Sequence, residues 1–332
     1  MERRTLLRGA AVVASGLAAP HVAHAQTPLT LNGAVQFNDD HVFTRTLVRF
    51  QELVTQYAGR PINWVLHKNS SLGLEKQYFE YMSAGRAVDY GIVSPAHMST
   101  FSRAAPFIDA PFLFRDLAHW NSVIDRDLFA PVAAEVERRA RVMLLGHAGG
   151  GVRNIFANRT ASNLAELRGL RVRVQGAPIW SRTFQAVGMA PQVVAYNEIY
   201  NAIQNNVLEA GENEAAGVLH MRFFEVAPNL IMTQHAITIR PICFSSQTFA
   251  RLPREMQEAV RRAGREAAAF GREAESGEDE TTLARLESEG RLRRIAFADR
   301  AGMQRAVQPV MQTYAREIEA DGILNTINAL TS

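Results

Sequence analysis

The sequence predicts an α/β protein made of two lobes. Strand-like segments and helix-like segments alternate through most of the chain, a pattern that is typical of mainly parallel sheets. The segments form two successive series, and the second begins after the glycine-rich stretch "GHAGGG" at residues 146–151. The chain has 332 residues, which is long enough for two domains.

The first series predicts a βαβαβ unit, in which a helix connects each strand to the next parallel strand. The helix between the first two strands has an apolar face that includes Phe43, Leu47 and Phe50, and the next helix ends at Gly85. In order, the expected elements are a strand at 29–37, a helix at about 40–58, a strand at 61–69, a helix at 74–85 and a strand at 88–95.

The second series follows a strand at 142–151 that we expect to end in a glycine turn. Asn163 and Glu166 form a capping-box-like start for a short helix, and Pro178 begins the next helix. The expected elements are a helix at 164–169, a strand at 170–175, a helix at 178–188, a strand at 190–196, a helix at 197–206 and long helices at 252–289. The many charges of these last helices predict a solvated face.

The first 25 residues predict an export signal. Arg3 and Arg4 precede a short apolar run, and a small-x-small pattern ends at Ala25, where we expect cleavage. The apolar run at 9–19 is far shorter than the roughly 20 residues that cross a bilayer. The paired arginines favour the twin-arginine route, and Glu2, where Ser or Thr is common, leaves the Sec route open.

Charge and motif content exclude several classes of function. Cleavage after residue 25 leaves 33 basic and 32 acidic residues, a balance that argues against nucleic-acid binding. Cys243 is the only cysteine, so no internal disulfide and no thiolate zinc site can form. The histidines do not fall at metal-ligand spacing, and motifs of hydrolases, metalloproteases and phosphate-binding loops are absent. We therefore predict neither a metal nor a cofactor.

Four polar residues lie near the ends of predicted strands, where open α/β sheets bind their ligands. They are Glu75, Arg153, Arg173 and Asn213. Together they offer two guanidinium groups, a carboxylate and an amide, which suit a hydroxylated carboxylate ligand. Arg171 lies farther from the end of its strand than Arg173, so we expect Arg171 to be solvated or structural.

Arg240 interrupts the apolar strand-like run "HAITIRPICF" at residues 235–244 and needs either water or an anion. Two interpretations stay open: Pro241 marks a sheet edge where Arg240 reaches solvent, or Arg240 faces the ligand and meets a second carboxylate or polar head. Trp180 and Tyr196 favour a ring or an apolar chain. We expect a monocarboxylate with hydroxyl or ring character, and a dicarboxylate is the alternative.

The order of several motifs carries a family resemblance. "SSLGLE" at 70–75, a glycine-x-Arg and a capped helix before "LRGLRVRV", then "EIYNAIQNN", "ENE" and "FFEVAPNLIMTQH" follow one another along the chain. The chain thereby resembles the solute-binding proteins of tripartite ATP-independent periplasmic (TRAP) transporters, of the dicarboxylate-binding (DctP) type. The similarity covers nearly the whole chain after the signal.

The resemblance implies a two-lobed periplasmic binding protein-like fold, with hinge strands and a long helix spanning the lobes. Lobe I would contain residues 26–150 and about 239–278, and lobe II residues 151–238 and about 279–332. Arg173 would form the salt bridge to the ligand carboxylate, and the pocket would be lined by Arg153, Asn213, Glu75 and Tyr196. The chain departs from the family pattern at Gln175 and Glu214, where proline is usual.

The expected function is that of a monomeric periplasmic protein, not an enzyme, which captures a small organic acid by lobe closure. It would deliver this acid to the membrane permease of a TRAP-type transporter. Two alternatives stay open: a periplasmic enzyme acting on a hydroxy acid with Glu75 as general base, or a ligand-binding subunit for a sensor. Turnover of the ligand distinguishes the enzyme from the binding protein.

Overall fold

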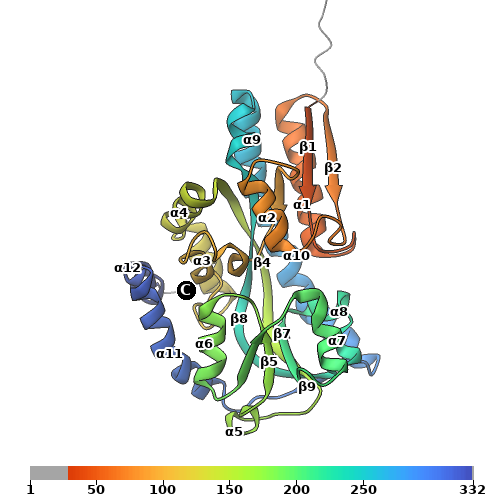
Figure 1. The fold of residues 1–332 in the computed structure, drawn as a ribbon, viewed down its shortest axis with the longest axis vertical. Helices are drawn as coiled ribbons and strands as arrows, with labels where there is room; N and C mark the ends of the chain where they lie inside the picture. Colours follow the sequence, from red (N-terminus) through yellow and green to blue (C-terminus); the bar gives the residue numbers. More distant parts are fainter. Residues whose placement is uncertain (1–28, 331–332) are drawn as a thin grey trace, which may run out of the picture.

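The computed structural model describes residues 29–330, and the predicted export signal lies outside these residues. One mixed sheet runs through both lobes, with helices on its two sides (Figure 1). Its strand order is β2-β1-β3-β8-β4-β7-β5-β6, and β9 pairs with β8. The predicted α/β class and two-lobed fold are confirmed. Within the described range, no helix is long and apolar enough to span a membrane.

The upper lobe in Figure 1 contains the predicted βαβαβ unit. Its strands β2 and β3 both pair in parallel with β1. The helix α1 ends where Gly59 adopts a left-handed conformation with φ of 60°, which glycine tolerates without strain. The elements of this part are β1 (Leu29–Ala34), α1 (Val42–Ala58), β2 (Ile62–His67), α2 (Glu75–Ser83), β3 (Tyr90–Ile92), the 3₁₀ helices η1 (Pro95–Met98) and η2 (Ala105–Phe107), α3 (Leu117–Asp125) and α4 (Ala130–Ala140).

Two long antiparallel strands, β4 (Val142–Ala157) and β8 (Asn229–Ser245), run from one lobe into the other. The expected glycine turn in 146–151 is wrong, because β4 continues through it. Gly149 and Gly150 both have φ of 121°, and the ladder shifts register between Gly149 and Val152. A Cβ atom at Gly149 would lie 2.1 Å from the carbonyl oxygen of Thr238. The glycines therefore permit an irregular, closely packed hinge strand.

The lower lobe contains the second α/β series. Its strand β5 pairs in parallel with β6 and β7, and β7 pairs antiparallel with β4. The elements are α5 (Leu164–Leu167), β5 (Arg171–Val174), α6 (Pro178–Ala186), β6 (Ala190–Val193), η3 (Tyr196–Glu198), α7 (Ile199–Gln204), β7 (Ala210–Asn213), α8 (Ala215–His220), η4 (Phe223–Glu225) and β9 (Arg293–Ile295).

The segment expected to form long helices contains one continuous helix, α10 (Arg254–Ser288), of 35 residues. It packs against β4 and α1 in the upper lobe and reaches α8 in the lower lobe (Figure 1). The hinge strands and the spanning helix implied by the resemblance are therefore present. The remaining helices are α9 (Ser246–Arg251), α11 (Arg300–Glu317) and α12 (Asp321–Ala329).

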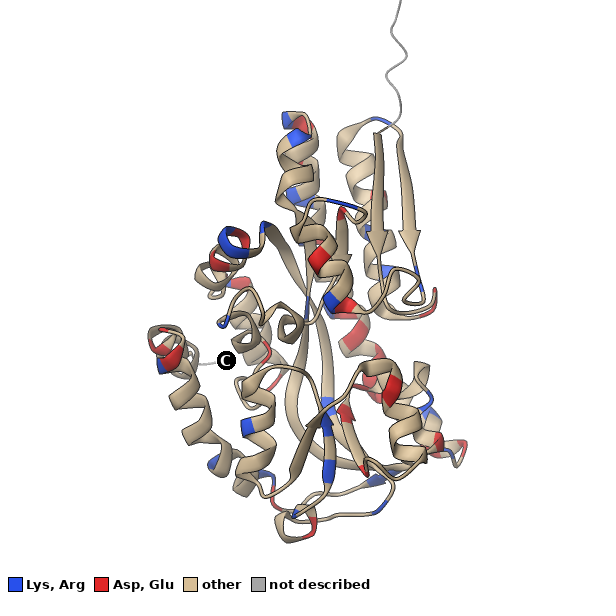
Figure 2. Cartoon of the chain, in the orientation of Figure 1, with Lys and Arg blue, Asp and Glu red and all other residues tan. Residues whose placement is uncertain are grey.

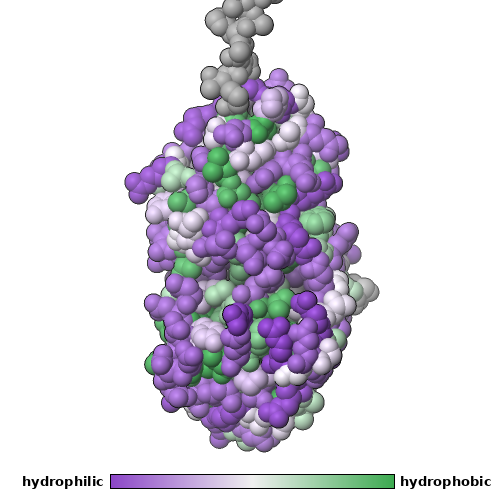
Figure 3. All heavy atoms as spheres, turned by 90° about the vertical axis from the view of Figure 1, so that its right-hand side faces the viewer, coloured by the Kyte–Doolittle hydropathy of each residue, from purple (hydrophilic) through white to green (hydrophobic). Residues whose placement is uncertain are grey.

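Charged residues of both signs are scattered over both lobes, and an acidic segment lies in the middle of α10 (Figure 2). The face shown in Figure 3 is mainly hydrophilic, with separate apolar spots. Among the described residues, the exposed large apolar side chains are those of Val48, Val193 and Val207. Positive and negative side chains are therefore mixed over the surface, in keeping with the near balance of charge in the sequence.

Candidate ligand-binding site

A small cavity lies where segments of the two lobes meet beside the hinge strands. Its volume is about 10 Å³, which is about the space needed for one water molecule. An organic acid can therefore enter only when the lobes separate or the lining side chains move. The lining residues are Gln36, Phe37, Glu75, His97, Arg153, Arg173, Gln175, Tyr196 and Arg240. The cavity thus brings together five of the seven predicted site residues.

Arg173 is the third residue of β5, and its neighbours Val172 and Val174 are buried in the apolar core. The guanidinium of Arg173 therefore points to the opposite side, and only 3% of the residue is exposed. Its Nε donates a hydrogen bond to the carbonyl oxygen of Val194 at 3.0 Å. Within residues 29–330, no carboxylate lies within ion-pairing distance of it. Burial lowers the pKa of Arg173 to about 10, so this cation gains stability from an incoming anion.

Arg153 differs from Arg173 because the protein itself neutralises it. On β4, its Nε and Nη2 bind the two carboxylate oxygens of Glu212 at 2.7 and 3.0 Å, and its Nη1 binds Glu214 at 2.6 Å. Burial opposes ionisation of Glu212, but Arg153 and a hydrogen bond from His235 outweigh it and lower the pKa of Glu212 to about 2. The two predicted guanidinium groups are therefore not equivalent, since Arg153 already has its anions.

Arg240 lies in the central strand β8 and is 6% exposed. The interpretation that it reaches solvent at a sheet edge is wrong, because β8 pairs with both β3 and β4 and Pro241 lies opposite His147. Its Nη1 is 3.7 Å from Asp109, and its Nε is 4.0 Å from Glu75. Arg240 thus faces the cavity while two carboxyl groups of the protein lie beside it.

Glu75 is the first residue of α2, and its carboxylate accepts a hydrogen bond of 2.6 Å from the backbone N–H of Ser94. Burial raises the pKa of Glu75, although Arg240 and this hydrogen bond oppose the shift. His97 lies 3.8 Å from Glu75. Burial, together with the charges of Arg173 and Arg240, lowers the pKa of His97 to about 3, so its imidazole is neutral at physiological pH.

Asn213 and Trp180 are not part of the wall of the cavity. Asn213 donates a hydrogen bond of 2.6 Å to the hydroxyl of Tyr196, which does line the cavity. Trp180 is fully buried, and its ring lies 5.5 Å from the guanidinium carbon of Arg153. Both residues therefore contact residues that line the cavity and do not line it themselves. The sequence pattern does not distinguish these two positions.

Several residues that shape the site were not among the predicted site residues. Gln36, Phe37, His97 and Gln175 line the cavity, and Glu212 neutralises Arg153. The sequence carried a signal for one of them. Gln175 follows Arg173 by two residues of extended backbone, so the two side chains point to the same side. For the others no local pattern distinguishes a site residue from a surface residue.

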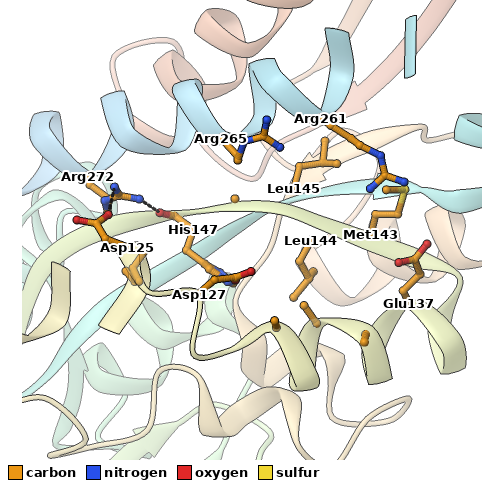
Figure 4. Close-up of a pocket in the computed structure, with 15 residues that line it drawn as sticks. Asp125, Asp127, Glu137, Met143, Leu144, Leu145, His147, Arg261, Arg265 and Arg272 are labelled. Carbon is orange, nitrogen blue, oxygen red and sulfur yellow. Dashed lines mark hydrogen bonds and ion pairs between the residues drawn. The ribbon is translucent and has the colours of Figure 1, made fainter. Parts of the chain in front are cut away.

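A larger pocket of about 540 Å³ lies along the first residues of β4, between α4 and α10 (Figure 4). Arg272 there donates hydrogen bonds to Asp125 at 3.1 Å and to the backbone oxygen of His147 at 3.2 Å. Its three arginines are matched by three acidic residues, and it contains none of the predicted site residues. The smaller cavity is the better candidate for the ligand site, because it contains a buried arginine without a carboxylate partner in residues 29–330.

No group of three or more His, Cys, Asp or Glu side chains within residues 29–330 could hold a metal ion. The two lobes are joined by β4, β8 and α10, and a buried arginine lines the cavity beside these elements. These features define a solute-binding protein for a small organic anion.

Comparison with known proteins identifies the family. The family described as bacterial extracellular solute-binding protein, family 7 (DctP), matches residues 33–317, so the chain belongs to this family. It is 42% identical to a solute-binding protein of Sulfitobacter sp. strain NAS-14.1 over 324 residues, which is 98% of this chain and 97% of that protein. The expected family membership is confirmed.

Among the similar solved structures, two illustrate how much of the chain is covered. A TRAP periplasmic solute-binding protein from Sulfitobacter sp. NAS-14.1, with bound alpha-D-taluronate, has a TM-score of 0.89 and 42% identity, covering 90% of this chain and 97% of its own. One from Roseobacter denitrificans, with bound beta-D-glucuronate, has a TM-score of 0.84 and 25% identity, covering 91% of this chain and all of its own.

The chain is therefore a periplasmic solute-binding protein of the TRAP type for a small organic acid. The predictions of function and of periplasmic location are confirmed. These similar proteins are binding proteins rather than enzymes, which does not favour the alternative of an enzyme acting on a hydroxy acid.

Proposed function

We propose that this protein binds a sugar acid of the uronate class, which has one carboxylate and several hydroxyl groups, and returns it unchanged. The observation that carries this proposal is Arg173, a buried guanidinium without a carboxylate partner in the described residues. One ligand carboxylate can bind its free N–H groups in a bidentate manner, and no second anion is needed at Arg153.

The other lining groups support a polyhydroxylated ligand with a single carboxylate. Glu75, His97 and Gln175 can each form hydrogen bonds with hydroxyl groups of a ligand. Arg240 already lies near Glu75 and Asp109, so it requires no second carboxylate from the ligand. The structure that is 42% identical to this chain contains alpha-D-taluronate, an acid of this class.

We further propose that the protein acts as a monomer and that Asn213 and Trp180 support ligand binding indirectly, through Tyr196 and Arg153.

The proposed lobe boundaries at about residues 150 and 238 fall inside β4 and β8, where Gly149 and Gly150 make the ladder irregular. Irregular hydrogen bonding at these points suits a hinge between lobes.

The test compares Arg173→Ala with Arg171→Ala by isothermal titration calorimetry with D-taluronate, D-galacturonate, D-glucuronate and succinate. Arg171 is a matched control because it is on the same strand, with a side chain 41% exposed and 3.6 Å from Glu209. Truncating one partner of a buried charge pair costs roughly 2–5 kcal/mol, so Arg173→Ala should weaken uronate binding at least about thirtyfold. Arg171→Ala should change affinity little.

Three outcomes contradict the proposal. Equal losses in the two variants would show that Arg173 does not bind the carboxylate. Tighter binding of succinate than of every uronate would favour a dicarboxylate site. Conversion of a uronate into another compound by the wild-type protein, detected by mass spectrometry of the recovered ligand, would favour the alternative of an enzyme.

A further inference from the structure

Gln175 follows the last residue of β5 and lies two positions after Arg173. Because side chains alternate along extended backbone, Gln175 and Arg173 lie on the same face, and both line the cavity. Gln175 is 2% exposed, so its amide is removed from bulk water. A buried amide needs hydrogen-bond partners on both its oxygen and its nitrogen.

The oxygen of this amide has its partner in the other lobe. Gln175 Oε1 accepts a hydrogen bond of 2.6 Å from the hydroxyl of Ser94, the residue that precedes η1. The backbone N–H of Ser94 in turn donates to the carboxylate of Glu75. Gln175 therefore connects the strand that contains Arg173 with the opposite wall of the cavity, which contains Glu75.

The nitrogen of the amide has no hydrogen-bond partner among the described residues. Nε2 of Gln175 is buried, and no acceptor of the described residues lies within hydrogen-bond distance of it. The nearby Arg173 and Arg240 cannot supply one, because guanidinium groups only donate. A buried donor without a partner is unfavourable, so a ligand that supplies an acceptor at this position gains affinity.

A ligand hydroxyl suits this position better than a second carboxylate. The hydroxyl of Ser94 can donate or accept, so the amide can present either its nitrogen or its oxygen to the ligand while the bond to Ser94 is kept. A ligand hydroxyl can also donate or accept and so matches either orientation of the amide, whereas a carboxylate oxygen matches only the orientation that presents Nε2. Arg173 is next to Gln175 on the same face, which places this hydroxyl close to the carboxylate of the ligand.

We propose that Gln175 is a specificity-determining residue that recognises a hydroxyl group near the ligand carboxylate. Because Gln175 is also hydrogen-bonded to Ser94, the ligand hydroxyl would join the hydrogen bonds that connect the two lobes. The inference rests on the proposed binding of a sugar acid at Arg173. It assigns the protein a preference for hydroxylated acids over plain carboxylates of the same length.

The test is calorimetry of the wild type and Gln175→Met with D-taluronate and its monodeoxy derivatives. Methionine keeps the approximate length of the side chain and removes the amide. The wild type should bind the derivative that lacks the recognised hydroxyl about 5- to 100-fold more weakly than D-taluronate. Gln175→Met should bind this derivative and D-taluronate equally. Gln192→Met is the matched control, because Gln192 lies opposite Arg173 on β6 and outside the cavity lining. It should keep the discrimination of the wild type.

Discrimination that is unchanged in Gln175→Met, with D-taluronate still bound, would overturn the role of Gln175 and leave the proposed function intact. Failure of the wild type to bind any uronate would instead contradict the proposed function. Circular dichroism checks that Gln175→Met is folded. Ser94→Ala provides a second route, since it removes the other partner of the same hydrogen bond and should reduce the same discrimination.

Discussion

Asp109 lies buried beside Arg240, with 1% of the residue exposed. Neither of its carboxylate oxygens has a hydrogen-bond partner in the described residues, and Arg240 Nη1 is 3.7 Å away. Burial raises the pKa of Asp109 to about 7, although Arg240 and Arg153 oppose the shift. Near neutral pH this carboxyl group therefore exchanges between its protonated and ionised forms, and the charge beside Arg240 changes with it.

We predict that Asp109→Asn removes a pH dependence of stability. The carboxyl group holds its proton more tightly in the folded protein than in the unfolded chain, so the folded wild type loses relative stability as pH rises from about 4 to about 7. Above that range the difference should level off. Relative to Asp109→Asn, the free energy of unfolding of the wild type should fall by up to about 4 kcal/mol over this range.

Urea unfolding at about pH 4, 5, 6 and 7 measures this difference. Asp127→Asn is the control, because Asp127 is exposed and forms no ion pair with the described residues. Parallel curves for the wild type and Asp109→Asn over the whole range would contradict the assigned shift.

Three glycines of α10 show how one element meets different surroundings along its length. A Cβ atom at Gly264 would lie 2.4 Å from Cβ of Leu145 on β4, and one at Gly271 would lie 2.6 Å from the hydroxyl of Thr46 on α1. A Cβ atom at Gly277 would meet nothing within 4 Å. The first two glycines allow α10 to approach the hinge strand and α1 closely, whereas Gly277 only lowers helix propensity.

We predict opposite effects for two chemically identical substitutions on this helix. Gly277→Ala should stabilise the protein by about 0.5–1 kcal/mol, because alanine favours helix more than glycine does. Gly264→Ala should destabilise it, because the added methyl group displaces β4 or α10. Chemical denaturation of both variants checks this, and stabilisation by Gly264→Ala would mean that α10 lies farther from β4 than described.

The small cavity admits an organic acid only when the two lobes separate or the lining side chains move. Direct contacts cross it, including the hydrogen bond between Ser94 and Gln175 and the edge-to-face packing of Phe37 on Tyr196. A ligand contacts both walls only when the lobes meet, so it favours the closed arrangement over the open one. The elements available to flex are the two hinge strands and α10.

We predict that small-angle X-ray scattering shows a smaller radius of gyration after addition of D-taluronate to the wild type. Arg173→Ala should show no such compaction at the same concentration, because the carboxylate then lacks its main cation. A scattering profile of the wild type that stays unchanged at saturation, as judged by calorimetry, would contradict lobe closure.

The α/β class, the first βαβαβ unit and the place of Arg173 on the strand β5 can all be predicted from the sequence. These features depend on local pattern, since alternation of apolar residues, helix caps and the end of a strand are visible within a few positions. The same local pattern predicts a solvated or structural role for Arg171, whose side chain is 41% exposed and lies 3.6 Å from Glu209.

Which buried arginines lack a carboxylate partner depends on the folded arrangement of the chain. Arg153 and Arg173 are both strand arginines, but Arg153 meets Glu212 and Glu214, about 60 positions away in the chain, whereas Arg173 meets no carboxylate in residues 29–330. Likewise, Pro241 indicated a sheet edge, yet β3 and β4 place Arg240 in the centre of the sheet. The availability of a charge depends on neighbours brought close by folding, and a local pattern cannot determine those neighbours.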